Sequence, residues 1–496
     1  MELHELNKKV EEVREHIKNK SLDKALNMMN IIIKDKENAE NKMVILEMGQ
    51  IYLASENFSD SKIWFKKVLD IDEDNVYAIR AMLRVLCNLE DYDEVGLYAK
   101  KIISYKEKFK NDVSDLINFL FRKLFKYKES DDQYNINKIV KILEICKECI
   151  EDCKLKNILT NELEILNKEF VLKSKPRVLI ISMTSKCNIR CKMCKVPLNH
   201  WDFPNDKLHE IYHLFPTLQK VIWHGGEPFL YQGIDDLIAE AGKYNVNQVV
   251  STNGLLLNEE RIKKVINNGM ELNISIHGLT EQIYELIHCG GNFKQLINNL
   301  EIIKNIQKSS NVYIKYGLKF LVMKSNYRQL SDLYDFVIKY GFNHVHVNTL
   351  GHDSISEENF IYHNDDSDIL KNVIKNSKIL SEKFKKADIS YEAWLPEFEN
   401  VSGICEYQNR NERKEQKFCC YMPWQSLQID IGGFVRNNCN CENLIVGNIN
   451  EEKIDDIWNN DKIVQIRKNI INNGFDEKCA LDCKNGRISN LYLKNM

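Results

Sequence analysis

The feature that most limits the possible folds of this chain is an alternation of short β-branched segments with longer amphipathic ones, which begins at Pro176. Six segments have the composition of buried strands, and they fall at residues 176–185, 220–226, 246–254, 271–278, 313–323 and 344–350. Such an alternation predicts parallel strands joined by crossover helices. We therefore expect an α/β domain over residues 173–390, an open partial barrel whose chemistry lies in the loops at the carboxyl ends of its strands.

The loop after the first predicted strand contains three closely spaced cysteines. Cys187, Cys191 and Cys194 have the spacing C-x3-C-x2-C in the run SKCNIRCKMCKVP. Soft thiolates suit iron–sulfur centres, and three from one loop can hold three corners of a [4Fe–4S] cluster while one iron stays open. A structural zinc knuckle is the alternative when these three cysteines are considered alone.

Short polar motifs follow the next predicted strands in turn. In chain order they are Gly225-Gly226-Glu227-Pro228, Thr252-Asn253-Gly254, Ser275 and Asn326. Together with the cysteine loop, this order and spacing resembles the radical S-adenosylmethionine (SAM) superfamily. The resemblance implies a partial (β/α)6 barrel of the radical SAM type. It also implies that the open iron binds SAM and that the reduced cluster cleaves SAM to a 5′-deoxyadenosyl radical, which abstracts hydrogen from a substrate.

The resemblance also implies which residues bind the cofactors. Cys187, Cys191 and Cys194 are the implied catalytic cluster ligands. The implied SAM-binding residues are Met193, Gly225, Gly226, Glu227, Thr252, Asn253, Ser275, His288 and Asn326. Two positions depart from the family pattern, because His277 stands where relatives often have Asp and His288 where they often have Arg. His288 either donates a hydrogen bond to the SAM carboxylate or is an exposed helix residue.

The segment 391–496 holds seven cysteines and little apolar periodicity, so we expect it to need metal to fold. It resembles the SPASM-type extension of radical SAM enzymes in its Cys-x2-Pro-Trp motif, a hairpin at IDIGGFV and a final cysteine pair. The implied ligands of one auxiliary [4Fe–4S] cluster are Cys420, Cys439, Cys479 and Cys483, with Cys419 and Cys441 as rivals and Cys405 unassigned. One auxiliary cluster is favoured over two because a dense C-x2-C-x5-C run is missing, and a zinc ribbon is the alternative.

The beginning of the chain carries a different signal, a match of apolar and small residues at a 34-residue interval. Ile45, Met48 and Gly49 correspond to Ile79, Met82 and Leu83. This resembles the tetratricopeptide repeat, so residues 1–110 are expected to form a short solenoid with a concave binding face, and residues 111–172 a helical connector. An ordinary antiparallel helical domain is the alternative. The cysteines of the connector, Cys146, Cys149 and Cys153, are expected to be buried on a helix face.

The charge and composition of the chain indicate which partners and which cellular compartment to expect. A net charge of −3 in 496 residues gives no reason to expect nucleic acid or a membrane surface as a partner. There is neither a secretory signal nor an uncharged apolar run long enough to span a bilayer, so we expect a cytoplasmic protein. Thiols stay reduced there, which favours metal ligation over disulfides for the 15 cysteines.

The function expected from these signals is modification of a peptide or protein substrate by hydrogen abstraction, as a cross-link or a side-chain oxidation. The helical repeats are expected to hold that substrate, and the resemblance implies an external electron donor such as flavodoxin or ferredoxin. One alternative is a radical SAM dehydrogenase of a small alcohol, sugar or aminocyclitol. Another is a non-catalytic scaffold of repeats and iron–sulfur clusters.

Overall fold

A computed structural model of the chain divides into two compact units, Met1–Leu163 and Glu164–Met496. The residues that it describes are 3–104, 110–130, 132–148, 150–194, 196, 200–309, 314–350, 357–360, 367–395, 420–437, 441, 443–474 and 476–479. Within these residues, no helix is both long enough and apolar enough to cross a membrane.

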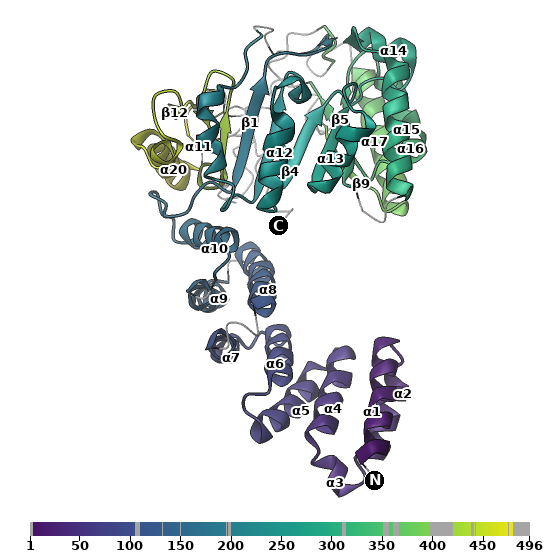
Figure 1. The fold of residues 1–496 in the computed structure, drawn as a ribbon, viewed down its shortest axis with the longest axis vertical. Coiled ribbons are helices and arrows are strands. Elements are labelled where there is room, and N and C mark those ends of the chain that lie inside the picture. The colour runs from purple at the N-terminus through teal and green to yellow at the C-terminus, as the bar shows by residue number, and fades with distance from the viewer. Residues whose placement is uncertain are drawn as a thin grey trace. The chain divides into compact units, whose positions relative to one another are not determined.

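The described part of the first unit consists of helices (Figure 1). They are α1 (Leu3–Lys18), α2 (Leu22–Ile32), α3 (Lys36–Ala39), α4 (Lys42–Ala54), α5 (Phe58–Ile71), α6 (Val76–Asn88), α7 (Tyr92–Ser104), α8 (Lys110–Glu129), α9 (Gln133–Lys147) and α10 (Cys153–Leu166), of which α10 crosses into the second unit. The starts of α4, α6 and α8 are 34 residues apart, and so are those of α5 and α7. The helical unit therefore fits the predicted repeat, and its period continues into α8.

Small residues allow the helices of one repeat to cross closely. A Cβ atom at Gly49 would lie 2.6 Å from the Phe65 ring, and the Ser61 hydroxyl donates a 3.0 Å hydrogen bond to the Gly49 carbonyl. The prediction that the cysteines of the connector are buried on a helix face is partly wrong. Cys146 is buried on α9, but Cys153 is exposed, because α9 ends at Lys147 and Cys153 begins the next helix. Cys149 lies outside the described residues.

The second unit is built on one ten-stranded sheet. Its strands are β1 (Val178–Thr184), β3 (Lys220–Gly225), β4 (Asn247–Thr252), β5 (Met270–Ser275), β7 (Tyr316–Val322), β8 (His344–Thr349), β9 (Ser390–Trp394), β10 (Ser426–Ile429), β11 (Phe434–Arg436) and β12 (Gly447–Asn448). The first six are the six predicted strands, parallel and in chain order, and the sheet is open. Strand β9 extends this parallel series by one strand that the sequence analysis did not include.

The tail adds strands to the other edge of the same sheet. β10 pairs in parallel with β1, from Val178 opposite Ser426 to Ile181 opposite Ile429. β10 and β11 form the predicted hairpin, and Gly433 occupies its turn at φ +81°. The tail and the barrel therefore share one sheet and one core.

Helices and short 3-10 turns connect the strands. They are η1 (Asn205–Lys207), α11 (Leu208–Tyr212), η2 (Pro228–Leu230), α12 (Ile234–Lys243), α13 (Glu259–Asn267), α14 (Glu281–Ile287), α15 (Phe293–Ser309), η3 (Tyr327–Asp332), α16 (Leu333–Tyr340), α17 (Ser367–Lys386), α18 (Met422–Gln425), α19 (Ile454–Ile457) and α20 (Asp461–Asn473). Figure 1 shows α12 and α13 lying over the strands. Apolar side chains of alternate strand positions, such as Ile181, Trp223 and Leu318, are buried in the core that includes these helices.

Candidate functional site

The cysteine loop leaves the carboxyl end of β1 and is tied to a distant part of the chain. A second, two-stranded sheet pairs β2 (Arg190–Cys191) with β6 (His288–Cys289), and Cys191 lies opposite His288. Cys187 and Cys191 are half-buried, whereas Cys194 is exposed. The backbone N–H of Cys194 donates a 3.0 Å hydrogen bond to the Cys191 carbonyl, which closes a turn between these two thiols.

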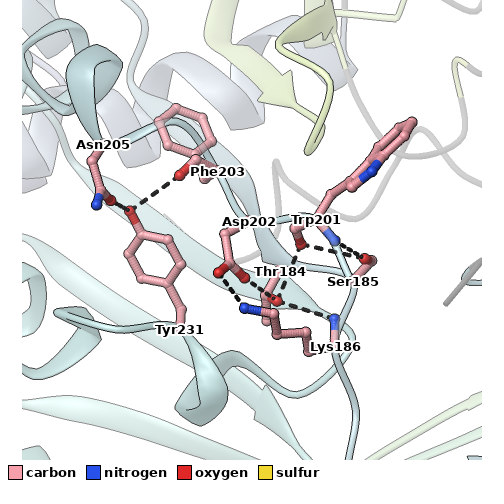
Figure 2. A network of polar contacts seen from close by, with 8 residues as sticks. All are labelled: Thr184, Ser185, Lys186, Trp201, Asp202, Phe203, Asn205 and Tyr231. Carbon is pink, nitrogen blue, oxygen red and sulfur yellow. Dashed lines mark hydrogen bonds and ion pairs between the residues drawn. The ribbon is translucent and has the colours of Figure 1, made fainter. Parts of the chain in front are cut away.

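A polar network holds the base of the cysteine loop (Figure 2). The Thr184 hydroxyl donates to Asp202 at 2.6 Å and accepts from the backbone N–H of Lys186 at 3.0 Å. The Lys186 ammonium pairs with the other Asp202 oxygen at 2.5 Å. Ser185 and Trp201 exchange backbone and side-chain hydrogen bonds, and the Trp201 ring remains 60% exposed. The sequence analysis missed Trp201 and Asp202, since neither belongs to a motif with a recognised spacing.

The Gly-Gly-Glu loop after β3 lies directly against the cysteine loop. Gly226 donates its N–H to the Thr184 carbonyl at 2.6 Å, and Glu227 donates its N–H to the Lys186 carbonyl at 2.8 Å. A Cβ atom at Gly226 would lie 2.1 Å from the Lys186 carbonyl oxygen, so only glycine allows this approach. Gly225 also has a φ of +132°, which other residues rarely adopt.

The Glu227 carboxylate is fully buried and joins two loops. Its oxygens accept hydrogen bonds from the Thr252 hydroxyl at 2.8 Å, the Asn253 N–H at 2.9 Å and the Phe229 N–H at 3.3 Å. Burial raises the pKa of Glu227, while the donors from Asn253, Thr252 and Phe229 oppose that shift. The carboxylate therefore positions the Thr252-Asn253-Gly254 loop, and its contact with SAM stays a prediction.

The loop that Glu227 positions reaches the first cysteine. Asn253 directs its side-chain N–H2 group to the side-chain oxygen Oδ1 of Asn188 at 2.8 Å and to the Cys187 sulfur at 4.0 Å. The side-chain oxygen Oδ1 of Asn253 accepts from the Leu255 N–H at 3.0 Å. Asn253 thus lies beside a predicted cluster ligand.

His288 lies beside the second cysteine and is not an exposed helix residue. It is fully buried, and its Nδ1 lies 3.1 Å from the Cys191 sulfur. Its Nε2 accepts the backbone N–H of His277 at 3.1 Å, so the single proton of the neutral ring is on Nδ1 and points to sulfur. Burial lowers the pKa of His288 to about 4. Both ring nitrogens have partners inside the protein, and the predicted contact of His288 with the SAM carboxylate stays a prediction.

Two neighbouring rings fix the plane of His288. Tyr284 stacks on it at 4.5 Å between ring centroids, and His277 stacks at 4.9 Å. His277 is itself held, because its Nδ1 accepts the Leu321 N–H at 3.1 Å. These contacts hold the Nδ1–H group of His288 toward the Cys191 sulfur without a bound cluster.

We expect His288→Phe to lower the reduction potential of the cluster held by Cys191. Phenylalanine keeps the ring stack but removes the donor to sulfur, and hydrogen bonds to cluster sulfurs tune the potential. One such bond at about 1 kcal/mol corresponds to roughly 40 mV for a one-electron couple. A redox titration that follows the electron paramagnetic resonance signal sensitive to SAM measures the shift.

Tyr284→Phe is the matched control, because the Tyr284 hydroxyl has no hydrogen-bond partner in the described structure. An unchanged reduction potential in a fully iron-loaded His288→Phe protein would contradict the hydrogen bond from His288 to the cluster ligand Cys191.

The remaining predicted SAM contacts have different environments. The Met193 side chain packs on a small apolar cluster that contains Ile287 and Met323. Ser275 is half-buried at the end of β5. Asn326 is fully buried, and its amide N–H2 donates to the carbonyls of His277 and Leu321, both at 2.8 Å. Asn326 therefore links two loops, and the SAM roles of all three residues stay predictions.

Only part of the predicted auxiliary site lies within the described residues. Cys420, Cys441 and Cys479 are half-buried and pack against the core of the second unit. The other tail cysteines named above, Cys405, Cys419, Cys439 and Cys483, lie outside the described residues. The choice among Cys439, Cys483, Cys419 and Cys441 as ligands therefore stays a prediction.

The polar face of the sheet is a further feature that the sequence analysis missed. The strand positions that alternate with the core residues carry polar groups here. Lys319 donates to the Ser251 hydroxyl at 2.8 Å, and Ser182 lies 3.4 Å from the His224 ring nitrogen. Burial, together with the nearby Lys319 charge, lowers the pKa of His224 to about 4. The signal was present in β5 and β8, where a polar residue recurs at every second position.

The cysteine loop fits the group that its spacing implies. Its three thiols come from one loop, and Asn253 and His288 place N–H groups beside two of them. Burial raises the pKa of Cys191 to about 12 and also raises that of Cys187. Both thiols are therefore protonated in the absence of metal, and binding of a cluster would have to displace these protons.

Comparison with known families identifies the two domains. Residues 181–336 match the model of the Radical SAM superfamily, and residues 419–484 match SPASM, an iron–sulfur cluster-binding domain. The chain therefore contains a radical SAM domain followed by a SPASM domain. A radical SAM domain binds a [4Fe–4S] cluster and SAM, and a SPASM domain binds auxiliary iron–sulfur clusters.

Several curated proteins are similar to parts of this chain. The tungsten-containing aldehyde ferredoxin oxidoreductase cofactor-modifying protein of Pyrococcus furiosus is 24% identical over 59% of this chain and 83% of its own length. An Fe-coproporphyrin III synthase of Methanosarcina barkeri is 28% identical over 33% of this chain. A GTP 3',8-cyclase of Helicobacter pylori is 32% identical over 29% of this chain. The chain spans only 41% and 46% of the lengths of the last two proteins.

A solved structure supports the fold. The crystal structure of Streptococcus suis SuiB aligns with a TM-score of 0.50 at 14% identity, over 72% of this chain and 82% of SuiB. At this identity the likeness shows the fold alone.

Proposed function

We propose that this radical SAM protein modifies a peptide or protein by hydrogen abstraction, as a cross-link or a side-chain oxidation. The observation that carries the proposal is the helical repeat unit, Met1–Leu163, in the same chain as the radical SAM and SPASM domains. Repeat solenoids present extended surfaces that suit polypeptides. A catalytic barrel acting on a free small molecule has no need of such a surface.

The residues of the site divide into three roles in this proposal. Cys187, Cys191 and Cys194 hold the cluster, and the bound cluster with SAM supplies the electron and the 5′-deoxyadenosyl radical that removes a hydrogen atom. Glu227 fixes the loop that would contact SAM. The polar face around His224 and Lys319 offers hydrogen bonds to the substrate backbone or side chains. An external flavodoxin or ferredoxin supplies electrons, and the tail cysteines hold an auxiliary cluster that accepts one from the substrate radical.

A small-molecule substrate is the second candidate. The Pyrococcus furiosus relative is named for modifying a cofactor, and it is similar to this chain over most of its own length. The polar sheet face would also suit a small alcohol or aminocyclitol. This candidate leaves the repeat unit with a role in recruitment of a partner protein.

The test uses the reconstituted full chain with a reductant, SAM and any short peptide that is found to be encoded beside its gene. We expect 5′-deoxyadenosine to form and the peptide to lose the mass of two hydrogen atoms, because hydrogen abstraction followed by loss of an electron and a proton removes both. Mass spectrometry of the peptide and chromatography of the nucleoside measure the two products. Formation of 5′-deoxyadenosine with an unchanged peptide, while a small polyol is oxidised, would favour the second candidate.

A further inference from the structure

The helical repeat unit contains a hollow between corresponding helices of three successive repeats. Helices α4, α6 and α8, together with Ile102 of α7, line a cavity of about 470 Å³. Tyr77, Arg80 and Arg84 come from α6, at spacings of three and four residues that place them on one helix face. Asp115 and Arg122 come from α8, seven residues apart on one face of that helix.

The residues that line this hollow include more positively charged side chains than negatively charged ones. Three guanidinium groups, those of Arg80, Arg84 and Arg122, face one carboxylate, that of Asp115. Among the described residues, the side chains of Arg84 and Arg122 make no ion pair or hydrogen bond, and both are exposed. The hollow thus holds guanidinium groups that are free to bind a ligand.

Some cations elsewhere on the repeats are neutralised by acidic neighbours. Lys62 pairs with Asp91 at 2.9 Å, and Lys123 pairs with Glu90 at 2.7 Å. Lys42, on the same helix α4 that lines the hollow, pairs with Asp72 at 2.7 Å. Arg84 and Arg122 of the hollow differ from these paired lysines, because their side chains have no such partner among the described residues.

Apolar and aromatic groups complete the hollow. Leu53 and Leu116, both buried, contribute to its lining. Phe119 is half-buried beside them, and the Tyr77 ring is 65% exposed. An apolar lining with guanidinium groups suits a chain segment that carries both acidic and apolar side chains, because guanidinium binds carboxylate in a bidentate fork.

We propose that this hollow binds an acidic segment of the polypeptide substrate, through Arg84 and Arg122. The proposal rests on the proposed function and names the chemistry of its substrate. Carboxylates of the segment meet the guanidinium groups, and its apolar side chains cover Leu53 and Leu116. Such a contact would hold the substrate by a part that is not itself modified, so that the reacting residue can vary.

Binding of a labelled peptide to the full chain tests the proposal without SAM or reductant. The probe is a fluorescein-labelled ten-residue peptide of alternating Glu and Leu, and its counterpart has Lys in place of Glu. We expect the acidic peptide to bind and the basic one not to bind in a fluorescence-anisotropy titration. Its affinity should fall as salt rises, because the contact is between exposed charges.

The double variant Arg84→Glu/Arg122→Glu should weaken binding of the acidic peptide by about tenfold or more, at roughly 1 kcal/mol or more for each bidentate pair lost or reversed. The matched control is Lys66→Glu/Lys100→Glu, which makes the same change of charge at exposed positions on α5 and α7 outside the hollow. The control should bind within about twofold of the unchanged protein, since long-range effects between exposed charges are screened.

Equal binding of the acidic and basic peptides would overturn the proposal, and so would equal losses in the two double variants. Tighter binding of an oligouridylate of the same charge would assign the hollow to a nucleic acid instead. Because the readout is binding alone, the hollow can be confirmed even when the test of peptide modification fails. If the Arg84→Glu/Arg122→Glu variant modifies its peptide at the unchanged rate, the proposed function stands. The hollow would then have no part in that function.

Discussion

Replacement of Cys187, Cys191 and Cys194 together by alanine is expected to abolish reductive cleavage of SAM and to leave the iron of the tail in place. Each thiolate holds one iron, and no other cysteine lies in that loop. The measurements are 5′-deoxyadenosine after reduction and iron and sulfide per chain. We expect the nucleoside to vanish and the iron content to fall by one cluster.

Cys289 provides the matched control for this triple variant. It is an exposed thiol on β6, next to His288 and opposite Arg190 in the two-stranded sheet. Because it lies in the neighbouring strand, it is a nearby thiol that could substitute for a lost ligand in a single-cysteine variant. We expect Cys289→Ala to keep full cleavage. Cleavage of SAM by the triple variant would refute the central assignment of the site.

Replacement of Glu227 by glutamine is expected to weaken SAM binding by about tenfold or more and to destabilise the protein by about 2 kcal/mol. Glutamine can keep one oxygen facing the Asn253 N–H and turn its N–H2 group toward the Thr252 hydroxyl. The Phe229 N–H then loses its acceptor inside the protein. Calorimetric titration with SAM and denaturant unfolding measure the two effects.

Two further measurements separate the positioning role of Glu227 from direct contact with SAM. If Glu227 positions the loop, amide hydrogen exchange at Asn253 and Gly254 should accelerate in Glu227→Gln even without SAM. Thr252→Val is the milder control, since it removes one donor and leaves the two backbone donors in place. Full SAM affinity in Glu227→Gln would remove this residue from the site.

The parts of the fold that follow from short-range patterns could be predicted from the sequence. Runs such as 178–184 and 247–252 are apolar and bounded by turn residues, so their strand character is local information. Their order in the sheet agrees with the tendency of successive strands to lie side by side when short crossovers connect them. The cysteine loop was found for the same reason, since all three thiols lie within eight residues of one another.

The features that were missed depend on partners far apart in the sequence. His288 meets Cys191 across 97 positions, and Glu227 meets Asn253 across 26. No local pattern states that a histidine near a glycine pair will lie beside a cysteine sulfur. The pairing of β10 with β1 joins Ser426 to Val178, and a four-residue strand in a cysteine-rich tail gives no sign of the edge that it will join.

This last pairing has a consequence for how the protein is made. During synthesis, β1 emerges from the ribosome long before residues 426–429, so one of its edges has no strand to pair with for much of translation. Bare edges of apolar strands are where nascent chains associate wrongly, and pairings between distant segments form slowly. We therefore expect the nascent barrel to depend on chaperones until the SPASM segment arrives, and chains terminated before residue 426 to accumulate as aggregates.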